Sequence, residues 1–127
     1  MDEQIRRSLS RGHRIDITTT GRKTRRPRRI EIVFHNIDGH LIITGSPRAD
    51  RKRAWLLNLE TDPRLTFHLK GAVTAADLPA TARVITDDAE RRAVATWVAT
   101  NAWPNVDVEA MTAYSPMIEV TLEDIAA

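Results

Sequence analysis

Residues 18–29 read Thr-Thr-Thr-Gly-Arg-Lys-Thr-Arg-Arg-Pro-Arg-Arg, and they separate two segments in which apolar and polar residues alternate. Six of the nine residues from Gly21 to Arg29 are cationic, so positive charge is concentrated in what we call the basic turn (residues 21–29). Gly21 can adopt a positive φ at no steric cost, and Pro27 restricts how the chain enters the next strand. Because like charges repel one another, this turn predicts an anionic ligand held by cationic side chains, threonine hydroxyls and backbone amides.

Alternation outward from the basic turn predicts three antiparallel strands in a meander. Residues 13–20 precede the turn and residues 29–35 follow it, so the turn forms the loop of a hairpin. Residues 36–39, Asn-Ile-Asp-Gly, carry an Asp-Gly hairpin signal before a third strand at residues 40–45. Ahead of the meander, residues 1–12 predict a short basic helix or arm.

The rest of the chain predicts two principal helices and three more strands. Helices are expected at residues 51–61, with Asp50 as N-cap, and from Asp87 to about Asn101, and strands at residues 65–70, 81–86 and 116–122. Residues 71–79 are interpreted as a loose connection and residues 103–115 as irregular. Short antiparallel strands with one inserted helix and one C-terminal helix are typical of a split β-barrel. We therefore expect an α+β fold of about six antiparallel strands, in a single domain over residues 1–127.

Length and composition narrow the class of protein. A chain of 127 residues suits one domain with a real core, and the absence of cysteine excludes disulfides, thiolate nucleophiles and sulfur-ligated metals. No apolar run is long enough to span a bilayer, and the N-terminus lacks the apolar segment of a signal peptide, so we expect a soluble, cytoplasmic protein. The histidines lack ligand-like spacing, so we expect no metal and ordinary surface or edge positions for His13, His35, His40 and His68.

The basic turn also belongs to a longer pattern. The run from Thr18 to Thr24 and the pair Pro27-Arg28 are followed by Ala-Trp-Leu-Leu-Asn-Leu at residues 54–59 and by Asp62-Pro63. This combination resembles the deazaflavin-dependent nitroreductase family, small actinobacterial proteins that use the cofactor F420. The resemblance covers roughly residues 15–85 and implies the same FMN-binding-like split β-barrel.

The resemblance also implies a set of site residues. Arg22, Lys23, Thr24 and Arg28 match positions that grip the acidic tail and phosphate of the cofactor, and Trp55 matches a tryptophan behind the cofactor ring. Residues 44–48, Thr-Gly-Ser-Pro-Arg, stand where the family has small residues, a lysine and two glycines. The remaining residues implied to bind cofactor are Thr44, Ser46 and Arg48, the last replacing the lost lysine. Ser46 and Tyr114 are the candidate hydrogen-bond donors to the acceptor or ring carbonyl.

Two of these positions also have a purely structural interpretation. Trp55 begins an apolar run, where a tryptophan is more often part of a core than of a cofactor site. Asn58 lies inside the same run and must satisfy a buried amide, for which we expect it to cap a neighbouring loop.

Three functions remain open from the sequence. The first is an F420-dependent oxidoreductase that transfers hydride from reduced deazaflavin to a small organic acceptor of the nitroaromatic, quinone or enone type. The second is a split-barrel protein that binds FMN or another anion with little or no turnover. The third is nucleic-acid binding through residues 22–29, which is disfavoured because no aromatic residue interleaves the cations. A homodimer is expected, since split barrels often place the cofactor between subunits.

Overall fold

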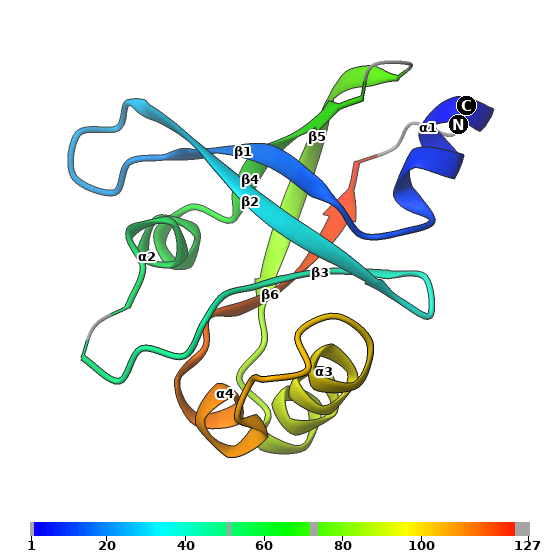
Figure 1. Cartoon of the computed structure of the whole chain (residues 1–127). Coiled ribbons are helices and arrows are strands. Elements are labelled where there is room, and N and C mark those ends of the chain that lie inside the picture. The colour runs from blue at the N-terminus through cyan, green and yellow to red at the C-terminus, as the bar shows by residue number, and fades with distance from the viewer. Residues whose placement is uncertain (1, 51, 72–73, 124–127) are drawn as a thin grey trace.

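The computed structural model describes residues 2–50, 52–71 and 74–123, and its centre is a closed antiparallel barrel (Figure 1). The strands are β1 (Arg14–Thr20), β2 (Pro27–Ile37), β3 (His40–Thr44), β4 (Arg64–Lys70), β5 (Ala75–Val84) and β6 (Met117–Leu122). The helices of the described residues are α1 (Glu3–Leu9), α2 (Ala54–Thr61), α3 (Asp88–Asn101) and α4 (Val108–Tyr114). Around the barrel the strands follow the order β1-β2-β3-β6-β5-β4. The predicted six antiparallel strands are therefore confirmed.

The barrel interior is filled by side chains that alternate along the strands. Ile15 and Ile17 on β1 are fully buried, and the rings of Phe34 and Phe67 meet edge to face with their centroids 5.3 Å apart. β1 pairs with β2 on one side and with β4 on the other, so Ile17 lies opposite both Ile30 and Phe67. Each such buried side chain contributes roughly 1.5–3 kcal/mol. The hairpin that carries the basic turn thus extends from a firmly packed base.

The inserted helix α2 lies beneath the basic turn, between β3 and β4 in the chain (Figure 1). Its residues Trp55, Leu56 and Leu59 join the barrel core. A helix that is apolar nearly all round must be buried on more than one side, and α2 is covered by the turn as well as by the barrel. The helix and the basic turn are therefore held at a fixed separation.

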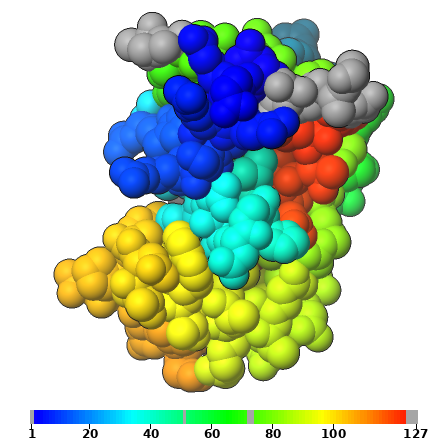
Figure 2. Space-filling view, turned by 90° about the vertical axis from the view of Figure 1, so that its right-hand side faces the viewer, coloured from blue at the N-terminus to red at the C-terminus, as the bar shows by residue number. Residues whose placement is uncertain are grey.

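A second apolar cluster lies outside the barrel, between the sheet and the helices α3 and α4. Its fully buried members include Ile85, Val98, Met111 and Met117. Figure 2 shows this part of the chain, yellow to orange, as a layer below the cyan strands β2 and β3. The segment that joins α4 to β6 therefore connects this layer to the barrel.

Three predicted elements are corrected by the structure. β5 begins at Ala75, so residues 75–79 are strand and not a loose connection, whereas residues 72–73 lie outside the described part. The predicted irregular segment 103–115 contains α4, which Asp107 caps by accepting a hydrogen bond from the Ala110 amide at 3.2 Å. α2 begins at Ala54, with Arg53 and not Asp50 at the N-cap; residue 51 is not described.

Two histidines also depart from the expectation of surface or edge positions. His35 and His68 are 4% and 7% exposed. His35 lies edge-on to Trp97 and Trp103, and burial lowers its pKa below the ordinary value. Across the described ranges, no group of His, Asp and Glu side chains is arranged to bind a metal, and no helix is both long and apolar enough to cross a membrane.

Candidate functional site

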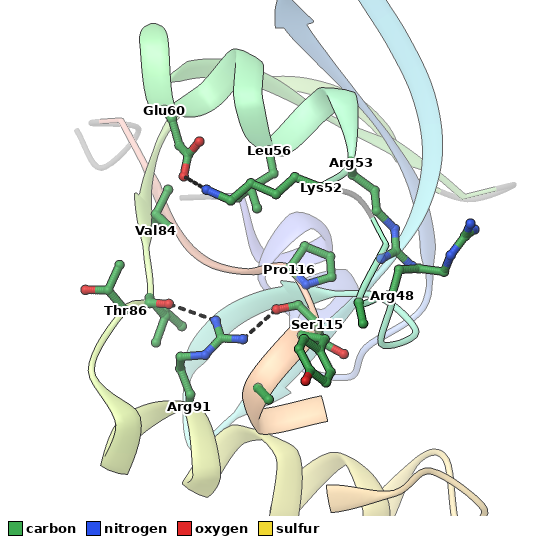
Figure 3. A pocket seen from close by; sticks show the side chains of 14 residues that line it. Arg48, Lys52, Arg53, Leu56, Glu60, Val84, Thr86, Arg91, Ser115 and Pro116 are labelled. Atoms are coloured by element: carbon green, nitrogen blue, oxygen red, sulfur yellow. Dashed lines mark hydrogen bonds and ion pairs between the residues drawn. The ribbon is translucent and has the colours of Figure 1, made fainter. Parts of the chain in front are cut away.

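Two pockets on opposite sides of α2 contain most of the predicted site residues. The turn pocket, about 360 Å³, lies between the basic turn and α2, and the α2–α4 pocket, about 450 Å³, lies between α2 and the α4–β6 junction (Figure 3). The turn pocket is lined by five of the predicted residues: Arg22, Lys23, Thr24, Arg28 and Trp55. Arg48 and Tyr114 line the α2–α4 pocket, and Thr44 and Ser46 line neither.

The backbone of the basic turn is fixed by its own hydrogen bonds. The Gly21 amide donates to the Arg26 carbonyl at 2.8 Å, and the Arg25 amide donates to the Gly21 carbonyl at 2.9 Å. The left-handed residue is Arg25, with φ of 60°, so the expected positive φ at Gly21 is not used. Gly21 is needed for space instead, because a Cβ there would lie 2.9 Å from the Thr24 hydroxyl oxygen.

Asn58 attaches this turn to α2. Its Oδ1 accepts a hydrogen bond from the Arg22 amide at 3.0 Å, and its Nδ2 donates to the Thr19 hydroxyl at 3.1 Å. Asn58 is buried, so its bond to Thr19 is shielded from water and its bond to Arg22 is partly shielded. The prediction that this amide caps a neighbouring loop is confirmed, and the loop is the basic turn.

Carboxylates divide the cations of the turn into two groups. Arg25 lies 3.7 Å from Asp62, and Arg29 donates to Asp16 at 2.8 Å. By contrast, no carboxylate in the described part of the chain lies within 4.0 Å of the pocket-lining cations Arg22, Lys23 and Arg28. Arg26 also lacks a carboxylate partner there, but it is exposed and does not line the turn pocket. Three of the turn's unpaired cations therefore line this pocket and remain available for an anion.

The Asp62 carboxylate contacts the basic turn at Arg25 and is stabilised in its ionised form. The Arg64 side chain and amide donate to it, and Arg25 adds a weaker attraction. These contacts lower the pKa of Asp62 to about 2. Asp62 therefore stays ionised even at acidic pH, and its partner Arg25 does not line the turn pocket.

Trp55 lies in a position that is compatible with both interpretations considered from the sequence. It is only 9% exposed and belongs to the barrel core, yet it also lines the turn pocket beside the unpaired cations. A buried aromatic ring next to cationic donors is suited to a planar, anionic molecule. The core position makes that ring rigid.

Of residues 44–48, only Arg48 lines either pocket, although the resemblance implies that Thr44 and Ser46 also bind the cofactor. Thr44 is buried, and its hydroxyl donates to the Pro116 carbonyl at 2.6 Å. Ser46 is exposed, and its carbonyl accepts a hydrogen bond from Arg53 at 2.6 Å. Arg48 donates to both carboxylate oxygens of Asp50, at 3.0 and 2.9 Å.

Arg91 is a pocket residue that the sequence analysis missed. It lies on α3 and donates hydrogen bonds from Nη1 to the Ile85 carbonyl at 3.0 Å and from Nη2 to the Ser115 carbonyl at 2.7 Å (Figure 3). Its Nε donates to the Thr112 carbonyl at 2.8 Å. Partial burial lowers the pKa of Arg91 from its ordinary, very high value. Its position in the helix, beside the solvent-exposed Arg92, gave no signal that it turns inward.

The donors in the turn pocket fit an anionic cofactor with a planar ring. Three cations without carboxylate partners suit a phosphate and an acidic tail, and Trp55 presents a fixed aromatic surface beside them. α2 separates this pocket from the α2–α4 pocket, so a molecule passing over the N-terminal end of α2 would contact both.

Structural comparison supports the split-barrel fold. A conserved hypothetical protein from Mycobacterium tuberculosis has a TM-score of 0.70 at 18% identity, with 98% of this chain and 82% of that one covered. The heme storage protein HutZ from Vibrio cholerae has a TM-score of 0.68 at 13% identity, covering 97% and 90%. An F420-H2-dependent reductase has a TM-score of 0.61 at 19% identity, covering 85% and 93%. At these identities the likeness shows the fold alone.

The sequence match is more specific than the fold. The family of F420H(2)-dependent quinone reductases matches over residues 2–123, far beyond the 15–85 region of the resemblance noted above. The deazaflavin cofactor expected from that resemblance is the one in the family's description, so FMN is not needed to explain the pocket. With the match extending over nearly its whole length, the chain belongs to the F420H(2)-dependent quinone reductase family.

Proposed function

We propose that this protein is an F420-dependent reductase that holds the acidic tail and phosphate of F420 in the turn pocket and reduces a small quinone. The observation that carries the proposal is the group of pocket-lining cations, Arg22, Lys23 and Arg28, that have no carboxylate partner among the described residues. Family membership adds the identity of the cofactor. Of the three acceptor types considered from the sequence, the quinone agrees with the family's description, and it takes precedence over a nitroaromatic or an enone.

The turn-pocket residues would bind and orient the cofactor. Arg22, Lys23 and Arg28 supply charge-assisted hydrogen bonds, while Asn58 keeps the backbone of Arg22 in place. The buried ring of Trp55 gives one wall that does not rearrange when a planar group is bound. Such preorganisation lowers the entropy that binding and reaction must otherwise lose.

The α2–α4 pocket would hold the acceptor. When bound in its reduced form, F420 would supply the hydride, and the quinone would take up that hydride and one proton to become a hydroquinone. Tyr114 lines this pocket and is 54% exposed, so its hydroxyl can donate a hydrogen bond to a quinone oxygen and exchange its proton with water. Ser46 lines neither pocket, which makes Tyr114 the better candidate of the two donors.

A fluorescence titration with oxidised F420 tests cofactor binding, with quenching of the buried Trp55 as the signal. We expect saturable binding at one site and a weakening of about tenfold in Arg28→Ala, which removes one charge-assisted contact. Arg26→Ala is the matched control, because Arg26 is an exposed cation of the same turn that does not line the pocket. The Arg26→Ala variant should bind F420 with the same affinity as the natural sequence.

Other outcomes of the titration would replace the proposal. Absence of F420 binding, or equal losses in the two variants, would refute the role given to the turn pocket. Tighter binding of FMN in a parallel titration would move the protein to the flavin alternative. Nucleic acid that co-purifies and dissociates steeply with added salt would support the third function instead. Homodimer formation is tested separately by sedimentation with and without F420.

A further inference from the structure

The α2–α4 pocket combines an apolar floor with a cationic wall. Leu56, Val84, Ile85 and Pro116 provide the floor. The wall contains four cationic side chains, Arg48, Lys52, Arg53 and Arg91, against the single carboxylate of Glu60. A volume of about 450 Å³ is within the range of small-ligand sites. The pocket thus suits a small molecule that is apolar at one end and anionic at the other.

Two of the wall cations already have carboxylate partners. Lys52 donates to Glu60 at 3.2 Å, and Arg48 is held by Asp50. Within each pair the two opposite charges cancel, so the pair presents little net charge to a ligand in the pocket. A positive charge without a carboxylate partner must therefore lie elsewhere in the pocket wall.

Arg91 carries that charge. Its three hydrogen bonds in the described part of the chain all go to neutral backbone carbonyls, and no carboxylate there lies within 4.0 Å of it. A guanidinium has five N–H donors, so two remain beyond the three that bind Ile85, Thr112 and Ser115. The side chain is half-buried and locked by these carbonyls, so it presents its charge to the pocket without further ordering.

Partial burial strengthens the attraction between this cation and a ligand anion. Charges interact more strongly where water is excluded, because the effective dielectric constant is lower than in solution. A neutral acceptor would gain only the apolar contacts with Leu56, Val84 and Pro116. An acceptor of the same shape with an acid group would gain those contacts and the charge.

We propose that the α2–α4 pocket selects acceptors that carry a carboxylate or sulfonate, with Arg91 as the residue that recognises the acid group. The inference rests on the proposed function, because it names the class of acceptor for that reaction. Recognition of the acid group is nevertheless independent of the turn pocket, since α2 stands between Arg91 and the basic turn. It can therefore be measured without cofactor.

The first experiment is a calorimetric titration of the cofactor-free protein with 2-naphthoate and with 2-naphthamide. These probes share one ring system and differ in charge. We expect the acid to bind about tenfold more tightly than the amide, as one charge-assisted hydrogen bond to a half-buried cation would give. Equal affinities for the two probes would overturn the proposal.

Three variants assign the preference to Arg91. Arg91→Gln should abolish it, whereas Arg92→Gln should retain it, because Arg92 is the next residue of α3, is exposed and pairs with Glu109. Glu60→Gln should increase the preference, since it removes the pocket's one carboxylate. Glu60 is exposed, so this variant stays informative even where Arg91→Gln fails to fold. A preference retained in folded Arg91→Gln, or lost in Arg92→Gln, would refute the assignment to Arg91. No change in Glu60→Gln would refute the electrostatic origin of the preference.

The second experiment uses turnover with reduced F420 and a matched acceptor pair, a benzoquinone propionate and its methyl ester. Their rings have nearly the same chemistry, so a lower KM for the acid with similar kcat would show selection at the pocket. Failure of the F420 titration together with a naphthoate preference would refute the proposed function and leave an anion site. F420 binding together with equal naphthoate and naphthamide affinities would refute only the acceptor selectivity.

Discussion

Asn58 on α2 accepts a hydrogen bond from the backbone amide of Arg22 at 3.0 Å, and this contact joins the inserted helix to the basic turn. The other half of the same side chain donates to Thr19 at the end of β1. One buried amide therefore fixes Arg22, near the start of the turn, relative to both the strand and the helix. The position of the pocket-lining cations depends on it.

Asn58→Ala should lower both stability and F420 affinity. It leaves the Arg22 amide and the Thr19 hydroxyl without their buried partner, at a cost of about 1–3 kcal/mol. Urea unfolding and the F420 titration measure the two effects. Thr61→Ala is the control on the same helix, because the exposed Thr61 hydroxyl bonds only to the carbonyl of Leu57 in its own helix. Unchanged F420 affinity in folded Asn58→Ala would show that the turn holds its shape unaided.

Asp62 should contribute to the acid limb of the stability profile. Its pKa is lowered to about 2 in the folded protein from an ordinary value of 3.8, mainly by Arg64. The unfolded state therefore takes up a proton first, so the stabilisation is complete above about pH 4 and is lost as the pH falls toward 2. We expect the unfolding free energy to fall less steeply over this window in Asp62→Asn.

Asp38→Asn is the control for that measurement. Asp38 is exposed in the β2–β3 turn, has φ of 53°, and can be replaced by Asn, which tolerates this conformation. Its profile should follow that of the natural sequence. If the unfolding free energy of Asp62→Asn fell with pH as steeply as that of the natural sequence, the Arg64 and Arg25 contacts would not persist in solution.

His35 should destabilise the fold below neutral pH. Burial lowers its pKa from the ordinary 6.5, and its Nε2 is buried without a hydrogen-bond partner in the described ranges. The unfolded chain binds the proton more readily, so the unfolding free energy should be unaffected above about pH 7 and fall as the pH drops below about 6.5. His35→Phe keeps an aromatic ring against Trp97 and Trp103 and should flatten that slope.

Tryptophan fluorescence during urea unfolding at pH 5, 6 and 7 gives the required free energies. His35→Gln serves as a second neutral replacement that lacks the ring. Both variants should lose the slope, although the glutamine variant should be less stable at every pH. A slope that survives in both would have to arise from another group.

The sequence predicted the strands whose side chains alternate clearly, and it failed where the local pattern was weak. Residues 75–79 contain no β-branched or aromatic residue, so they carry no strand signal of their own. They form a strand because β4 provides pairing partners, such as Lys70 opposite Ala75. Pro79 is tolerated because pairing with β6 begins only at Ala80. α4 has only seven residues, but Asp107 followed by Val108 and Met111 was a usable helix signal.

The candidate site was predictable to a similar degree. The cations of the basic turn could be identified because they are adjacent in the chain, whereas their division into paired and unpaired groups depends on Asp16 and Asp62, which only the folded chain brings near. Arg91 could not be found for the same reason. Its three carbonyl partners, Ile85 just after β5, Thr112 in α4 and Ser115 just after α4, are 6, 21 and 24 residues away in the chain.

Thr44 provides a test in which two interpretations predict different results. The resemblance implies a cofactor contact, but the structure directs the buried hydroxyl to the Pro116 carbonyl at 2.6 Å, where β3 meets the entrance to β6. Thr44→Val keeps the shape and removes the donor, so a structural role predicts a loss of about 1–3 kcal/mol in unfolding free energy from the unsatisfied carbonyl. Thr44→Ser keeps the hydroxyl and should retain most of that bond. F420 titrations at a temperature where both variants are folded then separate the two roles. Equal F420 affinities in the two variants support the structural role. Weaker F420 binding in Thr44→Val alone would instead support a cofactor contact by Thr44.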